Sequence, residues 1–139
     1  QFPLSDPIMQ EEIEQINRWF RTRLEPLWQR LTNIRISQLI GCSGAFDTIA
    51  DLIDQTDPGT KTRISQEIKP NDFEQIYQIL ITSTIAERTQ MKGMESIRIE
   101  MIVPSVLFIK LVVEQLNINK ILQTDYALRE GVLFERIFS

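Results

Sequence analysis

The chain has 139 residues, of which 42% are hydrophobic and 24% charged, a composition typical of a globular domain. With 15 basic and 19 acidic residues the formal net charge is -4, so we expect no nucleic acid partner. One cysteine and no histidine exclude an internal disulfide, histidine-dependent catalytic triads and zinc sites that need an imidazole. The length fits a single domain over residues 1–139.

The sequence also bears on the protein's environment. Its longest apolar stretch, residues 101–113, contains Pro104 and Lys110 and falls short of the roughly 20 residues that a transmembrane helix needs. We expect no signal peptide and no membrane contact, and therefore a cytoplasmic protein. Because the sequence begins at Gln1 without an initiator methionine, we expect a piece of a longer protein.

A long amphipathic helix is the first predicted element. Asp6-Pro7 is typical of an N-cap followed by proline at the first helical position. Apolar residues then recur at helical spacing as far as Leu31. Pro26 lies inside this pattern and predicts a kink or a restart of the helix.

A strand, a turn and a second helix follow. Residues 34–41 have the pattern of a strand that becomes more buried toward its end, and residues 46–53 that of a helix. Between them lies the small-residue turn Gly41-Cys42-Ser43-Gly44. Strand, turn and helix in this order form the first half of a βαβ unit. A further short strand is predicted over residues 64–68.

The second half of the chain is predicted to alternate helices and strands in the same way. Two pairs have the spacing of capping boxes, Asn71 with Glu74 and Thr84 with Glu87, and predict helices over about 71–83 and 84–91. The remaining elements are predicted as a buried helix over 98–116, a strand over 120–124 and a helix over 127–138. This alternation predicts the α/β class, with a mostly parallel sheet flanked by helices.

The turn at residues 41–44 is the strongest local signal for a ligand. Glycine lets the backbone approach a ligand, and the free amide groups at a helix N-terminus favour an anion such as phosphate. A tight turn without a ligand explains the same residues, and spacing alone does not decide between the two. Because the chain has no histidine to act as a base, Cys42 is interpreted as a small buried residue rather than a nucleophile.

Charged residues supply the other candidates. Asp47, Asp51 and Asp54 recur at helical spacing and are interpreted as a solvated helix face, with a cation site as the alternative. Arg98, at the start of the predicted buried helix, is either a capping residue or part of a site. Arg129 follows a predicted strand end, where ligands gather in open α/β sheets.

Three segments, in this order, resemble motifs of one family: residues 40–46, 87–102 and 124–133. The first is similar to a Gly-Thr-Ser-Gly-Thr turn and its helix. The second contains Glu87-Arg88 and Arg98-Ile99-Glu100-Met101-Ile102, similar to Glu-Arg and Arg-Ala-Asp-Ile-Ile. The third is similar to Ser-Asp-x-Gly-Leu-Arg-Glu-Gly-Ile-Leu. The ordered set resembles the Ppx/GppA family of exopolyphosphatases and guanosine pentaphosphate phosphatases.

This resemblance implies a ribonuclease H-like fold of the actin-like ATPase (ASKHA) superfamily. Residues 1–139 would form most of the second lobe of a two-lobed phosphatase, without the first lobe and the phosphate loops. The parent protein would hydrolyse terminal phosphoanhydride bonds of polyphosphate or of guanosine pentaphosphate (pppGpp), with a divalent metal such as Mg²⁺. On this piece the resemblance implies no catalytic residue and no bound metal, so the piece alone would be inactive.

The resemblance also implies which residues face the phosphate cleft: Gly41, Ser43, Gly44, Arg98 and Arg129. The implied partners are polyphosphate or a guanosine polyphosphate and the missing first lobe, with a homodimer left open. The sequence departs from the family pattern at Ala45, Glu100, Ser105 and Ala127. These departures favour an alternative, a non-catalytic nucleotide- or polyphosphate-binding or regulatory module.

Overall fold

Strand β3 (Lys120–Thr124) lies at the centre of the sheet that the structure, a computed structural model, describes within residues 4–42 and 44–138. The strand order is β1-β3-β2, with β1 (Gln38–Cys42) on one side and β2 (Gln66–Ile68) on the other. Strand β1 pairs with β3 in parallel, so that Cys42 lies opposite Thr124, and β2 pairs with β3 in the antiparallel direction.

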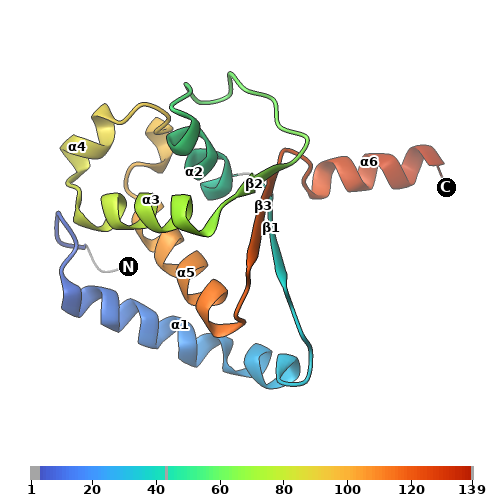
Figure 1. Cartoon of the computed structure of the whole chain (residues 1–139), viewed down its shortest axis with the longest axis horizontal. Helices are drawn as coiled ribbons and strands as arrows, with labels where there is room; N and C mark the ends of the chain where they lie inside the picture. Colours follow the sequence, from blue (N-terminus) through green and yellow to red (C-terminus); the bar gives the residue numbers. More distant parts are fainter. Residues whose placement is uncertain (1–3, 43, 139) are drawn as a thin grey trace.

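The predicted α/β class with a sheet flanked by helices is confirmed, and the described sheet is mixed, with β1 and β3 parallel and β2 and β3 antiparallel. The strand predicted over residues 120–124 forms with those bounds, whereas the other two form only in part, at Gln38–Cys42 and Gln66–Ile68. The antiparallel entry of β2 was not predicted. It follows from the irregular segment 55–65, which returns to α2 through Arg63 before β2 begins (Figure 1).

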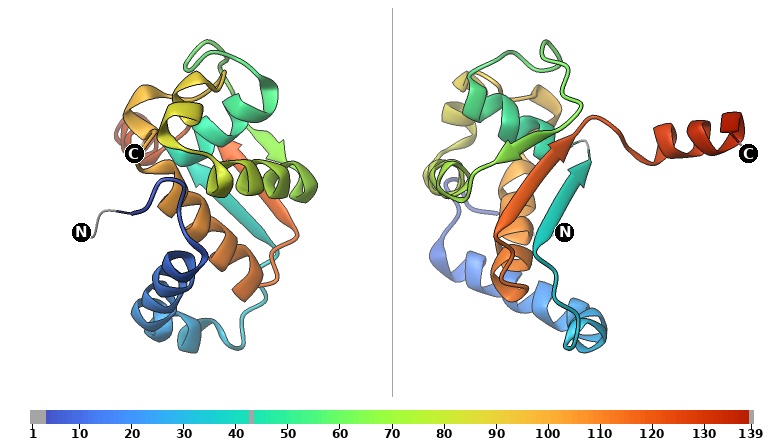
Figure 2. Two further views of the ribbon diagram at one scale, coloured as in Figure 1. Left: turned by 90° about the vertical axis from the view of Figure 1, so that its left-hand side faces the viewer. Right: turned by 45° about the vertical axis from the view of Figure 1, so that its right-hand side comes forward.

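Helices cover one side of the sheet, as Figures 1 and 2 show. They are α1 (Gln10–Leu31), α2 (Ala45–Asp54), α3 (Pro70–Thr82), α4 (Ile85–Gln90), the 3₁₀ turn η1 (Ser96–Arg98) and α5 (Ile102–Gln115). The last helix, α6 (Leu128–Phe138), extends away from the body of the protein (Figure 1). None of the helices described within residues 4–42 and 44–138 is long and apolar enough to cross a lipid bilayer.

The hydrophobic core lies between α5 and the helix-covered face of the sheet. Ile121 of β3 and Ile68 of β2 point into it, and each is only 1% exposed. Ile40 of β1 points to the opposite face, where it is 56% exposed because no described helix covers that face. The fully buried side of α5 carries the residues Ile102, Val103, Val106, Leu107, Ile109 and Leu111.

The start of α1 differs from the prediction. The helix begins at Gln10, and the carboxylate of Glu12 accepts hydrogen bonds from the backbone N–H groups of Ser5 and Met9 at 2.9 and 2.8 Å. Asp6, predicted as the N-cap, instead accepts a hydrogen bond of 2.7 Å from the backbone N–H of Ile85, the first residue of α4. A tertiary contact thus uses the capping group that the local pattern assigns to α1. The helix continues through Pro26, and its last turns bend away from the earlier axis (Figure 2).

One of the two predicted capping boxes forms. Thr84 Oγ1 accepts from the backbone N–H of Glu87 at 3.2 Å, and the Glu87 carboxylate accepts from the backbone N–H of Thr84 at 2.7 Å. The box predicted between Asn71 and Glu74 is wrong, because α3 begins at Pro70 with Lys69 as its N-cap.

The side chain that the second box would use has partners elsewhere. Glu74 Oε2 lies 2.6 Å from Lys110 Nζ of α5, and Glu74 Oε1 accepts from Gln78 at 3.0 Å.

The predicted start of the buried helix is also wrong. Arg98 ends the turn η1, and α5 begins only at Ile102.

The burial of α5 gives a stability test. Ile102 is 0% exposed, so Ile102→Ala should reduce the free energy of unfolding by about 2–5 kcal/mol through lost burial and a residual cavity. The neighbouring Met101 is 50% exposed, so Met101→Ala should change it by only about 0.5 kcal/mol. Urea denaturation of both variants measures this difference, and equal losses would show that α5 does not carry the core.

Candidate functional site

The turn before α2 brings together two of the predicted site residues. Gly44 precedes the first residue of α2 with φ +66° and ψ −117°, a conformation that residues with a side chain avoid. A Cβ atom at Gly44 would lie 3.2 Å from Nη2 of Arg98 and 3.4 Å from its Cζ. The Arg98 guanidinium, far away in the sequence, therefore packs directly on the glycine turn.

This contact has the chemistry of an anion site. The Arg98 side chain is 38% exposed, and its Nε lies 3.4 Å from Glu95 Oε2. In the described part of the chain the terminal nitrogens of Arg98 have no hydrogen-bond partner. The N-terminus of α2, a helix of 10 residues, begins beside them and adds the positive end of its dipole. Together these groups offer donors to phosphate oxygens.

The other residues of the turn have different roles. A Cβ atom at Gly41 would lie 2.0–2.2 Å from ring atoms of Phe46, so the glycine is required for packing of that ring whether or not a ligand is present. Ser43 lies outside the residues that the structure describes. Cys42 was predicted to be buried and is exposed, because it points to the uncovered face of the sheet.

The structure does not join Arg129 to this turn. Arg129 lies on α6 with 81% of its side chain exposed, and its Nε pairs with Glu130 Oε1 at 2.6 Å. Within the described residues no hydrogen bond or ion pair links Arg129 to Gly44 or Arg98. The site residues predicted from the sequence thus divide into the contacting pair Gly44 and Arg98 and a separate arginine on the projecting helix.

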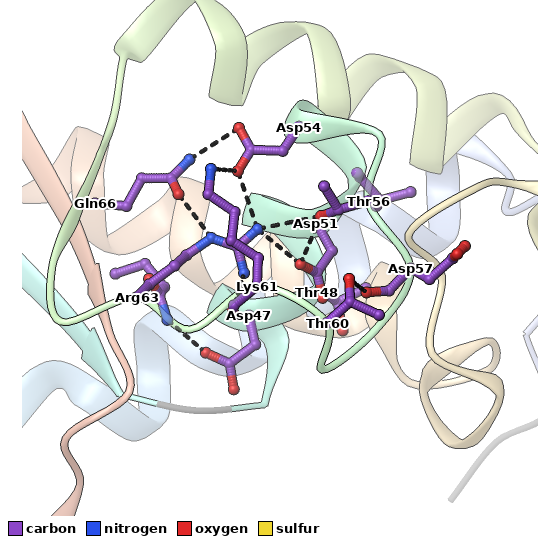
Figure 3. Close-up of polar contacts among 12 residues, drawn as sticks. Asp47, Thr48, Asp51, Asp54, Thr56, Asp57, Thr60, Lys61, Arg63 and Gln66 are labelled. Carbon is purple, nitrogen blue, oxygen red and sulfur yellow. Dashed lines mark hydrogen bonds and ion pairs between the residues drawn. The ribbon is translucent and has the colours of Figure 1, made fainter.

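The interpretation of the acidic stripe on α2 as a solvated face is wrong. Asp51 is 3% exposed, and its Oδ1 lies 2.7 Å from Nη2 of Arg63, which is itself 5% exposed. Asp54 Oδ2 lies 3.0 Å from the same nitrogen (Figure 3). Two carboxylates of the stripe therefore neutralise a buried guanidinium instead of facing water.

Arg63 also has partners outside α2. Its Nε donates to Gln66 Oε1 at 2.6 Å, and Gln66 in turn donates to Asp54 Oδ1 at 3.1 Å (Figure 3). Its backbone N–H donates to the carboxylate of Asp125, and its carbonyl accepts from the backbone N–H of Asp125 at 3.0 Å. Arg63 lies in an irregular segment without periodicity, so sequence reasoning gave no signal for it except a basic residue following an acidic stripe.

Gln123, in the central strand, was missed as well. It is 0% exposed, and its Nε2 donates to Asp47 Oδ1 and Asp125 Oδ1, both at 2.8 Å. Its Oε1 has no partner among the described residues. Because strands alternate their faces, Gln123 points into the helix-covered side with Ile121, a position where a polar residue must be satisfied by neighbours.

A pocket of about 340 Å³ lies between α2, the segment 58–63 and Asp125. Its carboxylates are those of Asp47, Asp51, Glu95 and Asp125, and its cations are Lys61 and Arg63. Within residues 4–42 and 44–138 no group of three or more histidine, cysteine, aspartate or glutamate side chains is arranged to hold a metal ion. The donor set therefore does not fit the divalent metal that the resemblance implies for the parent protein.

The α/β fold is shared with solved structures of one class of phosphatases. An exopolyphosphatase from Cytophaga hutchinsonii matches with a TM-score of 0.88 and 31% identity over 98% of this chain and 45% of that chain. A Ppx/GppA protein from Aquifex aeolicus matches with a TM-score of 0.78 and 17% identity over 96% of this chain and 42% of that chain. The chain thus spans less than half the length of these solved relatives.

The family follows from the sequence as a whole. The sequence profile of the Ppx/GppA phosphatase family matches residues 1–139. No sequence among curated proteins matches the chain. The chain belongs to the Ppx/GppA phosphatase family, which confirms the resemblance based on the three ordered motifs.

The ion pairs of Asp54 predict a pH-dependent stability. Burial raises the pKa of the Asp54 carboxyl, but hydrogen bonds from Lys61, Arg63 and Gln66 outweigh it and hold the pKa below its ordinary value. Such a group stabilises the folded state above its unfolded pKa, and this contribution is lost as the pH falls through the folded pKa. Asp54→Asn should therefore cost roughly 1–3 kcal/mol at pH 7.

The difference between wild type and Asp54→Asn should shrink below about pH 4. Thermal unfolding at a series of pH values measures it. Asp57→Asn is the matched control, because Asp57 is exposed and its carboxylate forms no ion pair among the described residues. A difference for Asp54→Asn that stays constant from pH 7 to pH 3 would contradict the assignment.

Proposed function

We propose that this chain forms the second-lobe half of the phosphate cleft of an exopolyphosphatase or guanosine pentaphosphate phosphatase. The whole protein would hydrolyse terminal phosphoanhydride bonds of polyphosphate or pppGpp by attack of water. The observation that carries the proposal is the contact between Arg98 and the Gly44 turn at the start of α2, in a chain of a phosphatase family. The similarity to an exopolyphosphatase at 31% identity supports the choice of substrate class.

In this proposal the chain binds and orients the phosphate chain. The terminal nitrogens of Arg98 and the first amide groups of α2 donate to phosphate oxygens, and their positive charge favours the substrate over water. Arg129 would join them from α6, together with the predicted cleft residues Gly41 and Ser43. The groups that activate water and hold Mg²⁺ would belong to the rest of the protein, so the isolated chain would be inactive.

The proposed partner of this chain is the first lobe of the same protein, in the cytoplasm. None of the residues of α6 is buried. Its apolar side chains are exposed, with Leu128 at 84% and Phe134 at 65%. A helix with exposed apolar side chains, on a chain less than half as long as its solved relatives, supports docking to the missing part, with self-association into a homodimer as the alternative.

A non-catalytic binding or regulatory module is the second candidate. The first residue of α2 is Ala45, where the family motif has a threonine, so the turn lacks one hydroxyl donor. Metal-dependent phosphate release by the full-length protein, abolished by changing its first-lobe catalytic glutamate to glutamine, would support the enzyme. Binding of polyphosphate without any phosphate release would support the module.

The phosphate site can be tested on this chain alone with inorganic tripolyphosphate and isothermal titration calorimetry. Arg98→Ala removes the charged donor and should weaken binding about tenfold, equivalent to 1.4 kcal/mol. Gly44→Ala should weaken it too, because the new Cβ lies 3.2 Å from Arg98 Nη2 and displaces the guanidinium. Binding by Arg98→Ala that equals that of the wild type would refute the site.

Gly59→Ala is the matched control for Gly44→Ala. Both glycines have positive φ, +73° and +66°, so alanine strains either turn by roughly 1–3 kcal/mol. A Cβ at Gly59 meets nothing within 4 Å, so Gly59→Ala should lose stability and keep its affinity for tripolyphosphate. Arg129→Ala is measured in the same way. Weaker binding of tripolyphosphate would assign Arg129 to the site, and wild-type affinity would exclude it.

A further inference from the structure

Arg63 connects α2, the helix that follows the Gly44 turn, to the end of the central strand β3. Through its side chain it binds α2, with Nη2 at 2.7 Å from Asp51 Oδ1 and 3.0 Å from Asp54 Oδ2. Through its backbone it binds Asp125, directly after β3, by a reciprocal pair of hydrogen bonds. A single buried residue therefore holds both α2, the helix that follows Gly44, and the segment that leads into α6.

A second residue, Gln123, also connects α2 to the end of β3. Gln123 Nε2 donates at 2.8 Å to Asp125 and, also at 2.8 Å, to Asp47 in the first turn of α2. The hydroxyl of Thr124 donates to the carbonyl of Ile64, the residue after Arg63, at 2.6 Å. The end of β3 is thus held by side-chain bonds to α2 and to the segment beside Arg63.

This geometry requires an arginine. Nε and Nη2 of one planar guanidinium bind Gln66 on β2 and two carboxylates on α2 at the same time. A lysine has the charge but a single ammonium group, which does not reproduce this fork. The Arg63 side chain is only 4% exposed, so the loss of one of its partners is costly.

We propose that Arg63 is a positioning residue of the phosphate site: it sets where residues 124–131 lie relative to the Gly44 turn. This inference rests on the proposed function, since it assigns the purpose of the placement to phosphate binding. Arg63 itself forms no hydrogen bond or ion pair with Gly44 or Arg98 in the described part of the chain. It acts only through Asp125 and through α2.

The test compares Arg63→Lys with Lys110→Gln. Lys110 is the matched control, because it is a partly buried cation of α5 paired with Glu74 of α3 and Glu114 of α5. Among the described residues, none of these three forms a hydrogen bond or ion pair with Arg63 or Asp125. Three quantities are measured for each variant: the melting temperature, the amide chemical shifts of Gly44 and residues 127–131, and the affinity for inorganic tripolyphosphate. We expect both variants to melt earlier than the wild type.

Only Arg63→Lys should move the amide signals of Gly44 and residues 127–131 and weaken tripolyphosphate binding at least fivefold. A melting temperature that falls while these amide signals and the affinity stay at wild-type values would overturn the proposal and leave Arg63 a stabilising residue only. If Arg63→Lys does not fold, Asp54→Asn removes one of the two carboxylates that pair with Arg63, keeps Asp51 and is judged by the same readouts.

Failure of the proposed function is a separate outcome. Wild-type chain that does not bind tripolyphosphate would remove the phosphate site and, with it, the purpose assigned to Arg63. The amide signals would still decide whether Arg63 places residues 127–131. Unmoved signals in Arg63→Lys would then refute the placement as well.

Discussion

A guanidinium that has left water must lie next to anions, because an unpaired buried charge is strongly destabilising. In this protein Asp51 and Asp54 meet that requirement for Arg63, and much of the architecture follows from their position on α2. Residues 55–65 must return over α2 to bring Arg63 to its partners, and β2 then enters the sheet in the antiparallel direction. The same return places the backbone of Arg63 beside Asp125.

Local signals predicted the elements whose ends use local partners. The box of Thr84 and Glu87 formed as expected, because both of its hydrogen bonds join residues three apart. The strand at 120–124 has the predicted bounds although its partners, β1 and β2, are distant in the sequence. Asp6 has the correct residue type for a cap, but its carboxylate accepts from the first residue of α4, a helix whose N-cap is Thr84, and not from α1. Helical spacing also grouped the carboxylates of α2 correctly, yet periodicity does not say what covers a face, and an irregular segment covers this one.

The candidate site was predicted in part, and for a reason other than spacing. Gly44 and Arg98 were named together only through the resemblance to the Ppx/GppA family, and the structure brings them into contact. Spacing alone left the turn open between an anion site and a tight turn. Gly41 shows why spacing does not decide. A glycine is required there because a Cβ atom would collide with the ring of Phe46, whether or not a ligand binds. Arg63 and Gln123 were not predicted, because their partners come from segments that no local pattern connects.

The anchoring of Asp125 also sets the direction in which α6 leaves the body of the protein. Up to Asp125 the backbone is held by Arg63, whereas Glu130 accepts from the backbone N–H of Ala127 at 2.8 Å and so closes the first turn of α6 upon itself. Tyr126, half exposed, lies between them, and its backbone N–H donates to Thr124 Oγ1 at 3.2 Å. Because Asp125, Tyr126 and Ala127 are each held by a hydrogen bond, α6 leaves the end of β3 in a defined direction, and whatever binds to it is oriented relative to the sheet.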